Sequence, residues 1–548
     1  MNKLLAPLAL ASFALAPSAA GQDFVQVLLQ EGQSIPGVGG TISTIRTVTA
    51  GVDAGWAALV NMTGTGGGPT IAVVGSLTGG LDTPPTLLRV PQVVGGLPQQ
   101  GGPRSLSLAG GRLAYSSYVQ GAMPGWAVFV DDQVIVQPGD PIPGTTDRWY
   151  GADSVQQLVG GQLLINGYLQ DGAGDIGLDV ALSFPNQSVF LREGDVLPGI
   201  SQSVRRFHLT WSPSGNHLMS RVQFFGTSNP LDAVLVDGQF ISLDGGVPFV
   251  RAGTIPDSVA GSAGRRWASI GPSYINDAGE VAVTGTYDIG AQNWYINLRD
   301  GVPISPAAPR QEAFGVTGID LDGYVLLNRV YSQNIADWIP HLHGVDLFRA
   351  DIGVDVDLDG QPDVGASIRE FFSVAVEDTV GRSDLLAIML LESSGAPTTR
   401  AVVRIGDYSL GQSVCAGVPN STGRSGKILA TRSDVAARND FVLHCIDLPT
   451  DSAGLALTSL STGFVPQAGG SQGTLCLGGA IGRLNSGVFL TERFGHGHVD
   501  LDLSGLPQGG GSTPVMAGQT WHFQVWYRDT VNGTATSNFT SAVAVPFR

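Results

Sequence analysis

The segment VFLREGDVLPG at residues 189–199 carries the pattern that decides the fold of this chain. It reads as an apolar strand, a Gly turn and a Pro that ends strand pairing. The same pattern recurs as LLQEGQSIPG at 28–37 and as VIVQPGDPIPG at 134–144, with weaker copies at 87–98 and 249–256. A motif that recurs in this way indicates a fold built from similar units.

Each unit also contains a Gly turn followed by a short strand of alternating polarity, as in SPSGNHLMS and NDAGEVAVT. With three or four short strands per unit and a period of about 54 residues, the pattern is typical of a β-propeller blade. The sequence therefore predicts an all-β propeller of about seven blades, with six or eight blades, or an array of β-sandwiches, as alternatives. The turn glycines are Gly55, Gly111, Gly161, Gly215, Gly279, Gly323 and Gly381.

The two ends of the repeat region each lack a neighbouring strand. The strand FVQVLLQEG at 24–32 has no partner before it, and RAVVRIGD at 400–407 has no motif strand after it. Pairing these two strands would close the ring and remove two exposed strand edges. We expect the propeller to span residues 21–410 and to be closed by this pair.

The sequence pattern changes at Gly411. From there to residue 548 the sequence reads as alternating strands broken by Gly, Pro and Asn turns, which predicts one C-terminal β-sandwich. All three cysteines, Cys415, Cys445 and Cys476, lie in this part of the chain. At most one pair of them can form a disulfide, so one thiol is left over.

The N-terminus has the pattern of a secretory signal peptide. Lys3 precedes an apolar run from Leu4 to Ala16, and small residues at Ser18 and Ala20 suit a signal peptidase. The apolar run is too short to span a bilayer. We expect residues 1–20 to be removed and the mature protein to be secreted, extracellular or in the cell envelope, without membrane insertion.

The composition limits the possible partners. The formal net charge is −17, and Lys427 is the only lysine after Lys3. Phosphate binding needs concentrated Lys and Arg, so nucleic acid and anionic membranes are excluded as expected partners. The 77 Gly and 32 Pro accompany 43% apolar and only 14% charged residues, which fits many short strands joined by tight turns rather than disorder.

Two groups of motifs resemble known secreted bacterial proteins. The C-terminal CAGVPNSTG at 415–423, GGSQGTLCLGG at 469–479 and WHFQVWYRD at 521–529 resemble a recurrent terminal domain of large exported proteins. The LREGDxLPG and INDAGEVAV segments are similar to a propeller-like repeat family in proteins of the same kind. This resemblance implies export, a Cys415–Cys476 disulfide and extracellular or envelope placement, but no activity. Cys445 departs from the pattern, and we expect a buried free thiol there.

The best candidate metal site is DVDLDGQPD at residues 355–363. Carboxylates at alternate positions with a Gly after the third let a loop curl around one hard cation, the geometry that calcium favours. The match to an EF-hand loop ends at its twelfth position, where Ala366 replaces the bidentate Glu, and an ordinary Asp- and Gly-rich turn is the alternative. The predicted calcium ligands are Asp355, Asp357, Asp359 and Asp363.

Catalytic motifs are weak. GGSQG at 469–473 matches Gly-x-Ser-x-Gly but lacks the strand before and the helix after that a nucleophile elbow requires. No phosphate-binding loop, HExxH or CxxC motif is present. Acids that recur with the blade motif, such as Glu31, Asp140, Glu193 and Asp195, favour a role in turns.

The sequence therefore favours a non-enzymatic extracellular binding or structural protein, whose ligand, a glycan or a protein, is not specified. The alternative is a propeller hydrolase or lyase that acts on extracellular polysaccharide. Two or three carboxylates from different blades at the channel mouth would favour the enzyme.

Overall fold

The computed structural model describes most of the chain between Phe24 and Arg548. The described residues are 24–36, 39–51, 55–63, 69–77, 85–89, 93–94, 97–171, 176–198, 201–225, 231–240, 267–289, 292–304, 308–309, 314–320, 323–329, 341–342, 345–347, 353–356, 363, 365–379, 382–393, 398–405, 408–491 and 494–548. The predicted signal peptide lies outside them.

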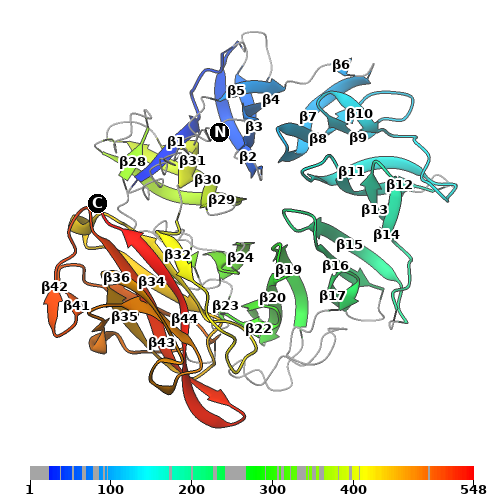
Figure 1. Ribbon diagram of the computed structural model, residues 1–548. Coiled ribbons are helices and arrows are strands. Elements are labelled where there is room, and N and C mark those ends of the chain that lie inside the picture. The colour runs from blue at the N-terminus through cyan, green and yellow to red at the C-terminus, as the bar shows by residue number, and fades with distance from the viewer. Residues whose placement is uncertain are drawn as a thin grey trace, which may run out of the picture.

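Seven small sheets follow one another around a ring in the described residues up to Ile405 (Figure 1). In the first six sheets consecutive strands pair antiparallel, whereas the seventh also contains the N-terminal strand and one parallel pair. We number these sheets as blades 1 to 7 in chain order. The predicted fold class, an all-β propeller of about seven blades followed by a β-sandwich, is confirmed.

The first four blades each contain four strands in sequence, and blade 2 has an additional short strand, β6 (Val93–Val94). Blade 1 contains β2 (Thr41–Ala50), β3 (Trp56–Thr63), β4 (Pro69–Ser76) and β5 (Thr86–Arg89). Blade 2 contains β7 (Leu97–Ala109), β8 (Arg112–Val119), β9 (Gly125–Val130) and β10 (Gln133–Val136). Blade 3 contains β11 (Arg148–Gln157), β12 (Leu163–Gln170), β13 (Ile176–Phe184) and β14 (Ser188–Arg192). Blade 4 contains β15 (Val204–Trp211), β16 (Leu218–Phe224), β17 (Leu231–Val236) and β18 (Gln239–Phe240).

The remaining blades are less regular. Blade 5 contains β19 (Trp267–Ile275), β20 (Val281–Ile289), β21 (Gln292–Arg299), β22 (Val302–Pro303) and β23 (Ala308–Pro309). Blade 6 contains β24 (Phe314–Ile319), β25 (Val325–Arg329), β26 (His341–Leu342) and β27 (Val345–Asp346). Blade 7 contains β29 (Ala366–Thr379), β30 (Arg382–Ser393), β31 (Thr399–Ile405), β1 (Phe24–Gln30) and β28 (Gly353–Asp355).

The N-terminal strand closes the ring. Strand β1 pairs antiparallel with β31, and Gln26 lies opposite Arg404. The closing strand is deeply packed, because Val25 and Leu29 are fully buried. The pairing expected from the two ends of the repeat region is therefore observed, and blade 7 is built from both ends of the propeller sequence.

The turn glycines are needed for their backbone conformation. Gly111, Gly161, Gly215, Gly279 and Gly323 all have positive φ, between +66° and +85°. A side chain is strained in that region, whereas glycine is not. Gly55 is instead required by close packing, since a Cβ there would lie 2.6 Å from Leu108. Gly381 lies outside the described residues.

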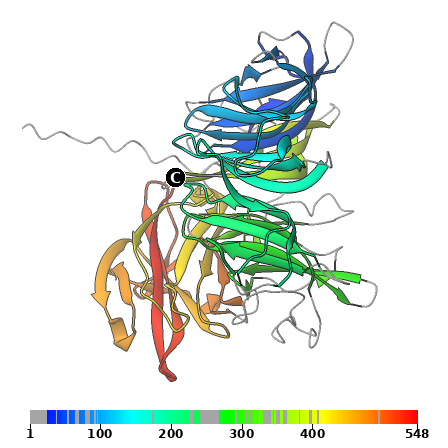
Figure 2. The same ribbon diagram turned by 90° about the vertical axis from the view of Figure 1, so that its right-hand side faces the viewer.

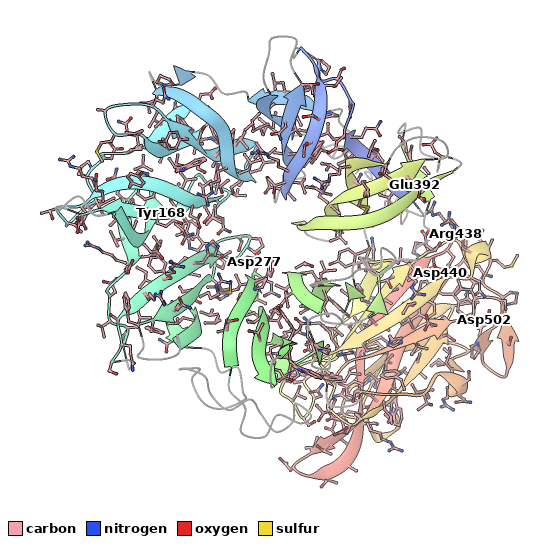
Figure 3. The ribbon with its side chains drawn as sticks, turned by 180° about the vertical axis from the view of Figure 1, so that it is seen from behind. Tyr168, Asp277, Glu392, Arg438, Asp440 and Asp502 are labelled. Atoms are coloured by element: carbon pink, nitrogen blue, oxygen red, sulfur yellow. A yellow bond between two sulfur atoms is a disulfide. The ribbon has the colours of Figure 1, made fainter. Side chains whose placement is uncertain are left out.

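Adjacent blades are held together by polar contacts as well as by apolar packing. The backbone N–H and the hydroxyl of Ser214 on blade 4 donate to Asp277 Oδ1 on blade 5 at 2.8 and 2.7 Å. Figure 3 shows Asp277 where the two blades meet. One apolar cluster, which includes Trp211, Phe224 and Ile296, is likewise shared by blades 3, 4 and 5.

The C-terminal sandwich begins at β32 (Gln412–Cys415). Its larger sheet contains β32, β44 (Thr534–Pro546), β43 (Thr520–Val531), β35 (Ala453–Ser459), β38 (Gly482–Arg483) and β39 (Phe489–Leu490). Its smaller sheet contains β33 (Lys427–Arg432), β34 (Phe441–Ile446) and β40 (Gly497–Leu501). Two hairpins are formed by β36 (Ser461–Pro466) with β37 (Thr474–Gly478) and by β41 (Leu506–Gln508) with β42 (Gly511–Thr513). Three short 3-10 helices are described, η2 (Ala436–Arg438), η3 (Ala468–Gly470) and η4 (Asn485–Gly487).

The smaller sheet of the sandwich packs on both of its faces. Phe441 and Leu443 point into the sandwich core with Phe523 of β43. Ile446 lies on the opposite face of the same strand, where it joins an apolar cluster with Tyr324 and other residues of blades 6 and 7. Figures 1 and 2 accordingly place the sandwich beside the ring, next to the blades coloured green.

The expected disulfide and the expected free thiol are both observed. Cys415 and Cys476 form a disulfide across 61 residues, and Cys445 is a buried free thiol. Burial raises the pKa of the Cys445 thiol well above its usual range, which disfavours the reactive thiolate.

Candidate functional site

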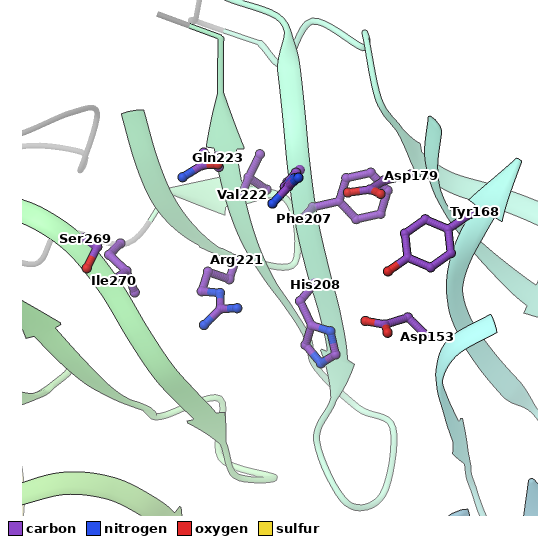
Figure 4. Close-up of a pocket in the computed structure, with 11 residues that line it drawn as sticks. Asp153, Tyr168, Asp179, Phe207, His208, Arg221, Val222, Gln223, Ser269 and Ile270 are labelled. Carbon is purple, nitrogen blue, oxygen red and sulfur yellow. The ribbon is translucent and has the colours of Figure 1, made fainter. Parts of the chain in front are cut away.

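A cavity of about 590 Å³ lies where blades 3, 4 and 5 meet. It is lined by strands β11, β15 and β19, the first strands of their blades, which lie innermost in the ring (Figure 1), and by the strands behind them. The lining residues are Asp153, Tyr168, Asp179, Arg206, Phe207, His208, Arg221, Val222, Gln223, Ser269 and Ile270 (Figure 4).

Blade 3 supplies the acidic wall of the cavity. Tyr168 on β12 and Asp179 on β13 are directly opposite each other in the ladder, so their side chains lie on the same face of the sheet. Asp153 lies at a register shift in β11, between Ala152 and Ser154, and accepts a hydrogen bond from the Tyr168 hydroxyl. A bulge of this kind re-aims a side chain.

The pKa of the Asp179 carboxyl is raised into the mildly acidic range. Burial, and then the Glu193 carboxylate, raises its pKa to about 6, against the opposing effects of Arg206 and the Phe207 N–H. Burial and the two aspartates also raise the pKa of the Tyr168 hydroxyl, which therefore stays protonated. The acidic wall thus contains a hydroxyl donor and a carboxyl that gains a proton near pH 6.

Blade 4 supplies the basic part of the cavity. His208 on β15 and Arg221 on β16 are paired in the ladder, which places their side chains on the same face. Arg221 Nη1 donates to the Gly271 carbonyl of blade 5 at 2.7 Å, and this contact orients the guanidinium. Burial and the nearby Arg221 charge lower the pKa of His208, so the imidazole is neutral at pH 7.

The rest of the lining is neutral. Phe207 gives the blade 3 side an aromatic face (Figure 4). On blade 5, the Ser269 hydroxyl is 2.6 Å from Thr286 Oγ1, and Ile270 is buried beside it. A few convergent polar groups with apolar and aromatic faces between them are typical of a ligand-binding cavity.

The arrangement suits recognition of a polyhydroxylated molecule. The aspartates and the Tyr168 oxygen accept hydrogen bonds from hydroxyl groups, Arg221 donates them, and Phe207 offers an apolar surface. Asp153, Asp179 and the adjacent Glu193 all belong to blade 3. The carboxylates from different blades that would favour a hydrolase do not line this cavity.

Two of the four predicted calcium ligands, Asp355 and Asp363, lie in the described residues. Asp355 is fully buried in β28, whereas Asp363 Oδ2 accepts the Val356 N–H at 2.7 Å. Asp357 and Asp359 lie outside the described residues. The four aspartates as calcium ligands therefore stay a prediction. The described part of the chain contains no group of three or more His, Cys, Asp or Glu side chains placed to hold a metal ion.

The repeated acids act in turns, as their recurrence indicates. Asp140 and Asp195 accept backbone N–H groups three residues earlier, from Gln137 and Arg192, at 2.9 and 2.8 Å. Glu193 accepts the Asp179 N–H at 3.3 Å. The acid of the blade motif therefore stabilises the turn between successive strands.

The serine of the GGSQG motif has a structural contact. Ser471 is buried, and its hydroxyl donates to the Ser537 carbonyl at 2.9 Å. It lies at the end of η3, without the strand and helix of a nucleophile elbow on either side.

The cavity residues were missed by sequence reasoning. None of them belongs to the repeated turn motifs, and they come from strands of three blades that the ring brings together. One usable signal was present: the charged pair Arg205–Arg206 and His208 interrupt the apolar pattern of an otherwise half-buried blade strand.

The sheets and this cavity define the class of the protein, a β-propeller with an appended β-sandwich. Among the described residues, no helix is long and apolar enough to cross a membrane. The sequence matches no protein-family model and no curated protein.

Three solved structures illustrate the structural similarity. Prolyl oligopeptidase B from Galerina marginata is 14% identical over 74% of this chain and 56% of its own, little more than half its length, with a TM-score of 0.33. The Dos1 propeller is 11% identical over 70% of this chain and 83% of its own, with a TM-score of 0.31. The subtype N10 neuraminidase-like protein of A/little yellow-shouldered bat is 8% identical over 68% of this chain and 99% of its own, with a TM-score of 0.27. We draw no functional conclusion from similarities this weak.

Proposed function

We propose that this protein is a secreted binding protein of the extracellular space or cell envelope, and that it holds a glycan in the cavity between blades 3, 4 and 5. The observation that carries the proposal is the cavity itself. Its hydroxyl groups, carboxylates and aromatic face converge from three blades, and rigid strands rather than loops supply the lining that the structure describes. A site on rigid elements is preorganised for binding.

Placement outside the cytoplasm rests on two independent features. The N-terminal sequence has the pattern of a signal peptide, and the Cys415–Cys476 disulfide is a bond that persists in oxidising compartments. Lysine is almost absent and the net charge is −17, which argues against nucleic acid as the partner.

One observation favours hydrolysis of polysaccharide as the second candidate function. The Asp179 carboxyl, with a pKa raised to about 6, is suited to donate a proton, and Asp153 lies on the same wall of the cavity. A carboxyl with a raised pKa beside a second carboxyl is the pattern of an acid and base pair. We rank this function second because both groups come from one blade.

A glycan array combined with a hydrolysis screen tests the proposal. We expect residues 21–548 to bind at least one glycan class without turnover, and Tyr168→Phe to weaken that binding. Arg112→Gln changes a surface arginine of blade 2, 46% exposed, and serves as the matched control. Turnover that is lost in Asp179→Asn would establish the second candidate instead, and the absence of binding to any glycan would overturn both.

The calcium loop is a separate proposal, because Asp355, Asp357, Asp359 and Asp363 are far along the chain from the cavity residues. Calorimetry of the EDTA-treated protein should detect binding of calcium, and Asp357→Ala should abolish it. An unchanged calorimetric trace in both proteins would mean that the loop is an ordinary turn.

A further inference from the structure

The charges in the cavity are separated along its length. On the blade 3 side, each aspartate has a cation beside it: Arg104 Nη2 is 3.0 Å from Asp153 Oδ1, and Arg206 acts on Asp179. On the opposite side, Arg221 makes no ion pair with a carboxylate among the described residues, and its partner in the β15–β16 ladder is His208. Within the described part of the chain, the positive charge of Arg221 is therefore not balanced by an adjacent carboxylate.

Arg221 has donors to spare. Its Nη1 is engaged by the Gly271 carbonyl at 2.7 Å, whereas a guanidinium carries five N–H donors in a planar fork. Figure 4 shows the guanidinium beside His208 in the middle of the cavity, with the acidic wall beyond. The neutral His208 imidazole adds one further donor or acceptor next to the fork.

We propose that the cavity binds an acidic sugar, with a sugar carboxylate on Arg221 and sugar hydroxyls on Asp153 and Tyr168. This inference rests on the proposed glycan-binding function and specifies the class of glycan. The planar guanidinium fork matches a carboxylate with two parallel hydrogen bonds, and such charge-assisted pairs are stronger than bonds between neutral groups. The acidic wall, which would repel an anion, recognises the neutral hydroxyl end of the same sugar.

The state of Asp179 adds a pH dependence to this binding. The charged and titratable groups that face it are Glu193, Arg206, Asp153 and Tyr168. As the pH falls through about 6, Asp179 gains a proton and the negative potential of the cavity decreases. An anionic sugar should therefore bind more tightly at pH 5 than at pH 7.5.

The test compares carboxylated glycans with their carboxyl-reduced counterparts, which differ only in the acidic group. We expect the carboxylated form to bind at least about tenfold more tightly, the size of effect that one charged hydrogen bond supplies. Arg221→Gln should remove this preference, so that the carboxylated and the reduced forms bind with equal affinity. Arg221→Lys, which keeps the charge without the planar fork, should retain part of it, and Arg112→Gln should retain all of it.

The possible outcomes distinguish the acidic-sugar inference from the proposed glycan-binding function on which it rests. Equal binding of the acidic and reduced glycans, or a preference for neutral glycans that survives in Arg221→Gln, would overturn the acidic-sugar inference and leave glycan binding intact. A preference for sulfated over carboxylated glycans would also overturn it, since sulfate is the competing anion. Failure of every glycan to bind would overturn the proposed function itself. Circular dichroism of each variant confirms that the fold is retained.

Discussion

Arg299 on blade 5 donates from Nη1 to Asp447 Oδ1 on the C-terminal sandwich at 3.0 Å, and both side chains are almost fully buried. The same guanidinium donates from Nη2 to Glu280 of its own blade at 2.5 Å. Arg424, on the sandwich, reaches the same cluster from the other side. A buried network of opposite charges therefore joins the propeller to the sandwich.

This junction is a modified form of a hydrogen bond that recurs in several blades. In blades 2, 4 and 5, an Asp at the turn after the third strand accepts a backbone N–H at the start of the second strand. The pairs are Leu113 with Asp131 at 3.1 Å, Leu218 with Asp237 at 2.9 Å, and Val281 with Asp300 at 2.8 Å.

The second oxygen of that Asp distinguishes blade 5. In blades 2 and 4 it is bonded by a basic residue of the same blade, Arg112 or His217. In blade 5 the corresponding position is Glu280, and Asp300 instead receives a hydrogen bond from Arg424 of the sandwich. Because Glu280 occupies the position that a basic residue holds in blades 2 and 4, the second oxygen of Asp300 bonds to Arg424 of the sandwich and not to a basic residue of its own blade.

Removing the buried cation of this junction should destabilise the protein strongly. We expect Arg299→Met, at a side chain only 4% exposed, to cost about 3–5 kcal/mol, because Asp447 and Glu280 lose their buried cation and keep only the more exposed Arg424. The equivalent loss in blade 2, Arg112→Met, removes a pair that is largely exposed and should cost at most about 1 kcal/mol. Urea unfolding of the two variants measures the difference, and similar values for both would contradict a role in docking.

Deleting residues 24–32 should open the ring. Strand β1 supplies the partner of β31, so its loss exposes the edge of β31 and the apolar surface that Val25 and Leu29 cover. We expect aggregation in size-exclusion chromatography and loss of cooperative unfolding. Deletion of residues 21–23 leaves β1 intact and should behave like the parent protein. A deletion of 24–32 that stayed monomeric and cooperative would show that the other blades suffice.

The disulfide should stabilise the sandwich by several kcal/mol. It closes a loop of 61 residues, for which the chain-entropy relation gives about 4 kcal/mol. We expect the double change Cys415→Ser and Cys476→Ser to lower the free energy of unfolding accordingly. Cys445 should remain unreactive toward a thiol reagent in the native protein and react once it is unfolded, because it is buried. Rapid labelling of the native protein would be inconsistent with this assignment.

The propeller could be predicted from the sequence because its determinants are local. Turns such as those at Gly215 and Gly279 need a positive φ that glycine alone adopts without strain, so the residue type and the backbone requirement coincide. The closing pair of β1 and β31 could also be predicted, because both ends of the repeat lacked a partner strand.

The candidate site could not be predicted in the same way. Asp153 and Asp179 lie on two strands of blade 3 and Arg221 lies on blade 4, so they come together only through strand pairing and the packing of neighbouring blades. The orientation of Asp153 depends on a register shift in β11, which leaves no mark in the polarity pattern. The docking role of Arg299 likewise depends on which face of the sandwich meets blade 5.

The Asp179 carboxyl should make the protein less stable as the pH rises from about 4 to about 6. Its folded pKa of about 6 lies above the usual value of 3.8, so within this window the folded state binds more protons than the unfolded state. Under that condition the free energy of unfolding falls as the pH rises. Asp179→Asn cannot ionise, and we expect the gap in stability between this variant and the parent to favour the variant increasingly from pH 4.5 to pH 7.5. Urea unfolding at both pH values measures the gap, and a constant gap would contradict the raised pKa.

His444 should act in the opposite direction. Its side chain is buried in β34, its Nε2 lies 2.8 Å from Thr431 Oγ1, and His498, Arg432 and His496 are the neighbouring groups that act on it electrostatically. Burial, followed by the electrostatic effect of these neighbours, lowers its pKa from 6.5 to about 3.

Between pH 3 and pH 6.5 the unfolded state therefore takes up a proton at this position that the folded state does not, so stability is lost as the pH falls below 6.5. At pH 5 the loss from His444 alone is about 2 kcal/mol relative to neutral pH. His444→Gln can bond to Thr431 but does not titrate, and we expect its unfolding free energy to fall less between pH 7.5 and pH 5 than that of the parent protein. Exposed His217, paired with Asp237, offers the control, because His217→Gln should leave the loss at pH 5 in place. Equal losses in the parent protein and His444→Gln would show that another group is responsible.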